Sequence, residues 1–168
     1  VYNNMFINKN LAYIDDEQAE KLKNVEVKKN DILLNITGAS VARCCIVPQK
    51  YIPARVNQHV SILRCKDSEI LPIFLCYQFT NKNYQRLLWE IATNGGATRE
   101  AITKQQIENL EVIIPPIEIQ NQFADFVTQV DKLKFTYKFN YTHKIYNIYS
   151  ILCLKMYKIF NFNKKTYL

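Results

Sequence analysis

The sequence lacks several features that mark large classes of protein. No apolar run is long enough to cross a bilayer, which argues against an integral membrane protein and against a membrane as partner. No opening segment joins a charged stretch to a short apolar run, so we expect no secretory signal and a cytoplasmic location. G-x-G-x-x-G, P-loop and N/D-P-P-Y/F motifs are missing, so we expect no catalytic residues and no cofactor bound by this chain.

Paired cysteines are also missing. The five cysteines are an odd number and show no C-x-x-C spacing: Cys44, Cys45, Cys65, Cys76 and Cys153. We expect them to be reduced and to act as small apolar residues, as in a cytosolic protein. A metal site built from Cys44, Cys65 and His59 is an alternative, but the usual ligand spacing is absent, so we expect no metal.

Glycine is scarce, with three residues in 168, and its placement is informative. Gly38 follows a predicted strand, and Gly95 and Gly96 stand together after a helical pattern. Glycine lets the backbone adopt left-handed conformations and come close to another surface. Both loops also contain polar and cationic residues, so they are the first candidates for a binding surface.

The basic charge is confined to the end of the chain. Residues 1–131 hold 14 Lys and Arg against 15 Asp and Glu, whereas residues 132–168 hold eight lysines and no acid. The net charge of +7 therefore does not by itself indicate a DNA-binding surface on the main part of the chain. The tail, 138–168, is rich in Lys, Tyr, Asn, Phe and Ile. It suggests a degraded or frame-shifted end, with a basic helix or a membrane-surface helix as alternatives.

The hydrophobic pattern predicts an α+β fold. Strands are expected at 32–37, 41–48, 60–65 and 112–115, and helices at 15–24 and 72–93. Thr103 and Gln106 have the spacing of a capping box and predict a short helix. Pro115 and Pro116 then end the last strand and open a long helix.

The long helix has apolar residues at alternating steps of four and three: Ile119, Phe123, Phe126, Val130, Leu133 and Tyr137. Such a stripe is the seam of a coiled coil and favours a partner helix, although it could instead pack on the sheet.

These pieces, in this order, resemble the specificity subunit of type I restriction–modification systems. The resemblance lies in AEKLKN…VKKNDILLNITGASVAR, then NQHVSILRC, then PIFLCYQF, and finally GGATREAITKQQIENLEVIIPPIEIQNQF. It covers residues 11–131. The chain departs from the family pattern at Asn30, where the family usually has glycine, and at Ile119, where it often has glutamate.

The resemblance implies three regions. Residues 1–114 would form a target recognition domain without its N-terminal part, built on a small mixed β-sheet with flanking helices. Residues 115–137 would form a coiled-coil-type spacer helix, and residues 138–168 a basic, aromatic-rich tail. The implied partners are double-stranded DNA, the methyltransferase subunit, the restriction/translocase subunit and a second specificity chain bound through the helix. S-adenosylmethionine, ATP and Mg²⁺ are implied only for the partner subunits.

Within that resemblance, residues near the glycine loops are the candidate DNA contacts. Thr37, Gly38, Ser40 and Arg43 belong to one loop, and Gly95, Gly96, Thr98, Arg99 and Lys104 belong to the other or follow it. Arginine suits guanine, and the amides of Asn57 and Gln58 suit adenine. Arg55 and Lys50 are expected to hold phosphates.

Three other functions remain open from the sequence. Asp16, Glu26 and Lys28 loosely match the D…E-x-K metal site of restriction nucleases, which would make the chain an enzyme. The same recognition module could belong to another type of restriction–methylation enzyme. The seam could also mark a protein-interaction remnant that does not read DNA.

Overall fold

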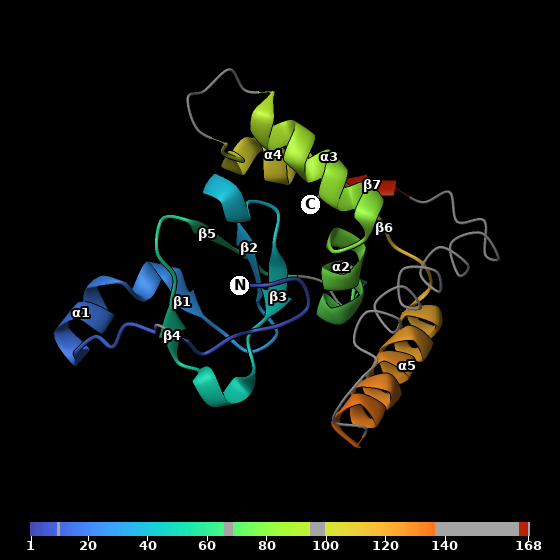
Figure 1. Ribbon diagram of the computed structural model, residues 1–168, viewed down its shortest axis with the longest axis horizontal. Helices are drawn as coiled ribbons and strands as arrows, with labels where there is room; N and C mark the ends of the chain where they lie inside the picture. The colour runs from blue at the N-terminus through green and yellow to red at the C-terminus, as the bar shows by residue number, and fades with distance from the viewer. Residues whose placement is uncertain (10, 66–68, 95–99, 137–164, 168) are drawn as a thin grey trace.

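The computed structural model describes residues 1–9, 11–65, 69–94, 100–136 and 165–167. The fold is α+β, with small antiparallel sheets and five α-helices among these residues (Figure 1). The central sheet has three strands in the order β3-β2-β5, namely Cys44–Ile46, Ile32–Asn35 and Val60–Leu63. The sequence led us to expect a mixed sheet, but every strand pairing in the described part of the chain is antiparallel.

The central sheet is covered on both faces because successive apolar residues of β2 point to opposite faces. Ile32 and Leu34 belong to the main core with the helices, whereas Leu33 packs with Val27 and Val47 on the other face. All four residues of β2 are buried. The second face is closed by β1 (Glu26–Val27) and β4 (Ala54–Arg55), which pair with each other.

The first predicted helix is α1 (Asp16–Lys21), and its start follows from the sequence. The Asp15 carboxylate accepts a hydrogen bond from the Gln18 backbone N–H at 2.7 Å, which is an ordinary N-cap. A short 3-10 turn at Lys23–Val25 connects α1 to the first strand, and similar turns at Gly38–Ser40 and Gln49–Tyr51 connect later strands.

The single helix predicted at 72–93 is wrong, because two helices occupy this segment. They are α2 (Pro72–Phe79) and α3 (Lys82–Thr93), which lie above and beside the central sheet in Figure 1. The side chain of Asn81 accepts a hydrogen bond from the Asn83 N–H at 2.9 Å and starts the second helix. The apolar pattern continues across this junction, so it hides the break.

The capping box predicted at Thr103 and Gln106 is confirmed, and it starts α4 (Lys104–Glu108). Strand β6 (Glu111–Ile113) follows and pairs with β7 (Lys165–Tyr167) near the end of the chain. The long helix is α5 (Ile117–Thr136), which begins directly after the proline pair. Residues 137–164 lie outside the described residues, so Tyr137 and the alternatives for the tail stay predictions.

Helix α5 packs on α2, so part of the predicted seam is used within the chain. Phe123 is buried, and its ring makes edge-on contacts with Phe74 and Tyr77, both at a centroid distance of 5.4 Å. The residues of the seam with partial exposure are Ile119, Phe126 and Val130, whereas the side chain of Leu133 lies outside the described residues. A partner helix for the coiled coil stays a prediction.

Candidate functional site

The antiparallel register brings two of the predicted loops to the same end of the central sheet. Asn35 at the end of β2 faces Val60 at the start of β5. Residues 36–40 and 57–59 therefore leave the sheet side by side. The Ile36 N–H donates to the His59 carbonyl at 2.9 Å, which extends the pairing by one residue beyond the strands.

The end of the second glycine loop joins the same place. The Gly38 N–H donates to the Glu100 carbonyl at 3.1 Å, and the Ile102 N–H donates to the Ile36 carbonyl at 2.8 Å. Thr37 and Ala101 form an isolated antiparallel bridge between these bonds. We call residues 36–40, 57–59 and 100–102 the loop cluster. Gly95, Gly96, Thr98 and Arg99 lie outside the described residues, so their predicted DNA contacts stay predictions.

Gly38 is needed for its backbone conformation. Its φ is +69°, where a side chain is strained, although nothing lies within 4 Å of an added Cβ. It starts a 3-10 turn in which the Ser40 hydroxyl accepts a hydrogen bond from the Asn35 amide at 2.8 Å. Glycine therefore shapes the loop, and the space around it stays open.

The 57–59 segment presents three exposed polar side chains. The side-chain carbonyl oxygen of Asn57 accepts a hydrogen bond from the His59 backbone N–H at 3.1 Å. The His59 ring contacts the Thr37 hydroxyl through Nδ1 at 2.7 Å, and the Gln58 amide nitrogen through Nε2 at 3.4 Å. Sequence reasoning considered His59 only as a metal ligand, because its place beside Thr37 depends on a pairing between residues 22 positions apart.

Two of the predicted cationic contacts lie beside the loop cluster. The Arg43 N–H donates to the Ser40 carbonyl, and its guanidinium lies over the Tyr2 ring, 4.8 Å from the centroid. Lys104 begins α4 directly after residues 100–102, and its side chain is 88% exposed while it pairs with Glu108 at 3.6 Å. The Lys104 side chain is thus exposed beside the loop cluster, whereas the Arg43 guanidinium rests on the Tyr2 ring.

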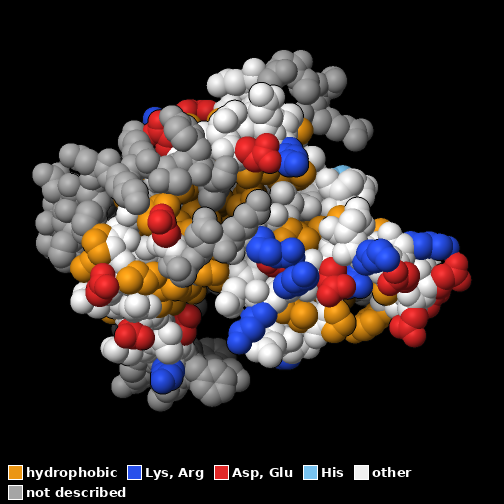
Figure 2. Space-filling model, turned by 180° about the vertical axis from the view of Figure 1, so that it is seen from behind, with side chains coloured by type: hydrophobic (Ala, Val, Ile, Leu, Met, Phe, Trp, Pro, Cys, Tyr) orange, Lys and Arg blue, Asp and Glu red, His pale blue; other side chains and the backbone are white. Residues whose placement is uncertain are grey.

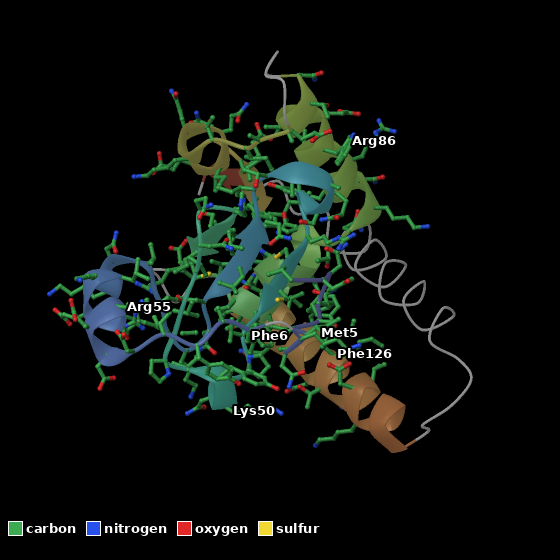
Figure 3. The ribbon with its side chains drawn as sticks, turned by 60° about the vertical axis from the view of Figure 1, so that its left-hand side comes forward. Met5, Phe6, Lys50, Arg55, Arg86 and Phe126 are labelled. Atoms are coloured by element: carbon green, nitrogen blue, oxygen red, sulfur yellow. The ribbon has the colours of Figure 1, made fainter. Side chains whose placement is uncertain are left out.

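Arg55 and Lys50 lie elsewhere in the fold (Figure 3). Arg55 donates to the Ala19 carbonyl of α1 at 3.2 Å and forms an ion pair with Glu26 at 2.9 Å, with only 14% of its side chain exposed. Lys50 lies over the Tyr51 ring at 5.0 Å. The geometry gives no support for joint phosphate binding by these two residues and the loop cluster.

The metal-site alternatives find no support in the geometry. The Cys44 thiol lies 3.5 Å from the Cys76 thiol, while His59 contacts Thr37. The Glu26 carboxylate is paired with Arg55 rather than placed in a cluster of acids. Among the described residues, no group of three or more His, Cys, Asp or Glu side chains is arranged to hold a metal ion.

Cys44, Cys45 and Cys76 behave as core residues. Burial raises the pKa of the Cys44 thiol, which also contacts Cys76, and burial raises the pKa of Cys45 to about 11. A thiol with a raised pKa stays protonated and is a poor nucleophile or metal ligand. These residues therefore fill the interior, as the sequence predicts for unpaired cysteines.

An ion pair between the buried Asp31 and the partly exposed Arg64 closes the opposite end of the central sheet. Asp31 is 1% exposed, accepts two hydrogen bonds from Arg64 at 2.6 and 2.8 Å, and accepts one from the Lys28 N–H at 2.6 Å. Asn30 before it has a φ of +69°, which explains physically why glycine suits this position. Lys and Arg side chains gather near the centre of the face shown in Figure 2.

Comparisons with known proteins indicate the family of the chain. Residues 1–145 match the family model described as the type I restriction modification DNA specificity domain. The chain is also 24% identical over 128 residues to the putative type I restriction enzyme MjaX specificity subunit of Methanocaldococcus jannaschii. That match covers 73% of this chain and 29% of the relative, so the chain spans less than a third of the relative's length. No helix among the described residues is long and apolar enough to cross a membrane.

Proposed function

The chain belongs to the family of type I restriction modification DNA specificity domains, and on this premise we propose that it recognises a DNA sequence for a type I restriction–modification complex. In this role it directs partner subunits to a target site and performs no chemistry itself. The methyltransferase subunit would supply S-adenosylmethionine, and the restriction subunit would use ATP and Mg²⁺. A second specificity chain is the proposed partner of α5.

The observation that supports DNA recognition best is the convergence of three loops at one end of the central sheet. The Gly38 N–H bonds to the Glu100 carbonyl, and the Thr37 hydroxyl bonds to His59. Loops held by a rigid sheet are the usual place for binding residues. The side chains there include the partly exposed hydroxyl of Thr37 and the exposed amides of Asn57 and Gln58, which are groups that pair with base edges in the major groove.

The nuclease alternative has less support, because the Glu26 carboxylate that it requires is paired with Arg55. The interaction-remnant alternative also has less support, because the seam residue Phe123 is buried against α2 within the chain. Neither alternative gives the loop cluster a role.

The test is selection of preferred sequences from duplex DNA with a randomised core, followed by competition binding at fixed salt. We expect Arg43→Ala and Arg99→Ala to reduce the preference for the selected sequence about tenfold, the usual effect of losing one base contact. Arg86→Ala is the matched control, because Arg86 is 82% exposed on α3 and pairs with Glu90. Equal loss of affinity for all sequences would mean phosphate contacts alone. No preference in the wild-type chain would disprove the proposed function.

A further inference from the structure

Each polar group of His59 has a partner, although its side chain is exposed. Its carbonyl accepts from the Ile36 N–H at 2.9 Å, and its N–H donates to Asn57 at 3.1 Å. Its ring meets the Thr37 hydroxyl at 2.7 Å. Fixing an exposed side chain costs conformational entropy, so a fixed imidazole at the centre of the loop cluster calls for a functional reason.

The chemistry of the neighbours sets the direction of the bonds. The Gln58 amide nitrogen can only donate, so Nε2 of His59 accepts from it. In a neutral imidazole the proton then lies on Nδ1, which donates to the Thr37 oxygen. The Thr37 side chain makes no capping bond to the 3-10 turn that follows it. Its own O–H therefore remains available to donate outward.

The two ends of this chain of bonds have complementary uses. The Gln58 side chain keeps its carbonyl oxygen and one N–H, which match the N6 and N7 edge of adenine. The Thr37 hydroxyl is a donor and suits an acceptor such as guanine O6, thymine O4 or a purine N7. All three side chains are uncharged in this state, which suits base edges better than phosphates.

We propose that His59 is a positioning residue that joins Thr37 and Gln58 into one unit for recognising base edges in duplex DNA. The role rests on the proposed function. His59 sets the Thr37 hydroxyl as a donor and holds the Gln58 amide in place for adenine. The unit binds as a whole, so loss of its centre affects both ends.

The first test needs no DNA. A long-range nitrogen–proton correlation spectrum at about pH 8, above the ordinary titration range of histidine, reports which ring nitrogen is protonated. The chain has two histidines, and His59→Phe identifies the signal of His59. We expect the proton on Nδ1. A proton on Nε2 would overturn the proposed bond directions and leave the proposed function untouched.

The second test measures preference for the selected duplex over random duplex at fixed salt, using the full chain. We expect His59→Phe and Thr37→Val each to lower the preference about tenfold, with affinity for random duplex within about twofold of the wild type. The double variant should lose no more than the more severe single variant, because both remove one unit. His59→Asn keeps an amide N–H near the position of Nδ1 and should recover part of the preference.

Three outcomes have distinct meanings. A wild type with a clear preference that His59→Phe and His59→Asn both retain would overturn the role of His59. Independent, multiplying losses in the double variant would overturn the joint unit. Circular dichroism and thermal melting of each variant identify any loss of preference that comes from unfolding. If His59→Phe is unfolded, the preference of His59→Asn decides whether His59 has the proposed role. A wild type without preference would refute the proposed function, and with it this inference.

Discussion

The side-chain amide of Gln78 on α2 pairs with the backbone of Ile113 on β6 as a neighbouring strand would. Its nitrogen donates to the Ile113 carbonyl at 3.1 Å, and its oxygen accepts from the Ile113 N–H at 2.8 Å. One side chain thus completes both hydrogen bonds of a strand residue and fastens α2 to β6. The pairing fixes the strand that leads into α5.

Replacing Gln78 with leucine should destabilise the fold. Both polar groups of Ile113 lose their partner in a partly buried place, so we expect a loss of about 2 kcal/mol in the free energy of unfolding. Urea denaturation measures this loss. Gln105→Leu is the control, because Gln105 is exposed on α4 and should change stability by less than about 0.5 kcal/mol. Equal effects of the two variants would contradict the role of Gln78.

Gln120 has a second amide of this kind at the start of α5. It is fully buried, accepts from the Leu71 N–H at 2.7 Å, and donates to the carbonyls of Glu69 and Pro115 at 2.7 and 2.8 Å. We expect Gln120→Leu to cost about 3 kcal/mol in the free energy of unfolding, because three backbone groups in a buried or partly buried place lose the amide that pairs with them. Urea denaturation measures the cost, and proteolysis around residues 115–117 should become faster.

The control for this position is Gln122→Leu, which changes an exposed residue of the same helix. It should leave both stability and proteolysis close to the wild type. A stable Gln120→Leu variant with unchanged proteolysis would mean that apolar packing of Phe123 alone docks α5.

Variants of Asn30 test why the family usually has glycine at the position before Asp31. Its φ of +69° is costly for residues with an ordinary side chain. We expect Asn30→Ala to lower the free energy of unfolding by about 1 kcal/mol, and Asn30→Gly to preserve it within about 0.5 kcal/mol. Thermal unfolding of both variants measures the difference. Lys29→Ala is the neighbouring control and should have little effect, and equal melting of the alanine and glycine variants would contradict the argument.

Alkaline pH should weaken the fold through its buried thiols. Burial raises the pKa of Cys45 to about 11, and burial also raises the pKa of Cys44. An unfolded thiol ionises near pH 8.5, so the folded state binds more protons than the unfolded state above that pH. The stabilisation that the protonated, buried thiols contribute is therefore complete below about pH 8.5 and is lost as the pH rises toward 11.

Urea unfolding under reducing conditions at a series of pH values from about 8 to 11 measures this loss. Cys45→Ala should be less stable at the lower end because it loses buried atoms. Its stability should then fall less steeply with pH than that of the wild type. Cys44 and Tyr84, whose pKa burial also raises, keep part of the slope. An unchanged slope would contradict the assignment to Cys45.

The elements set by local chemistry could be predicted from the sequence. The Asp15 cap and the box at Thr103 and Gln106 involve residues within three positions, and both form as expected. The apolar runs predicted β2, β3, β5 and β6, with ends that differ by up to three residues, but the short strands β1, β4 and β7 were missed. The junction at Asn81 was missed because its cap sits inside a continuous apolar pattern.

The candidate site was harder to predict because its contacts are distant in sequence. Glycine scarcity indicated the Gly38 loop, and the pairing of Gly38 with Glu100 brings the end of the second loop to it. The contact between Thr37 and His59 depends on the register of β2 and β5, which no local pattern fixes. Charge alone did not reveal that Arg55 is held by Glu26.

Variants of Arg55 distinguish a structural role of this residue from a role in DNA binding. Its guanidinium joins α1 to the β1–β4 pair through Ala19 and Glu26, so we expect Arg55→Ala to cost about 2 kcal/mol in the free energy of unfolding. Arg55→Lys should recover little, because an ammonium group cannot make the forked contacts of a guanidinium. If Arg55 instead holds a phosphate, the slope of log affinity against log salt concentration should fall by about one in Arg55→Ala. We expect that slope to stay unchanged at a temperature where the variant is folded, because the guanidinium is already engaged within the protein.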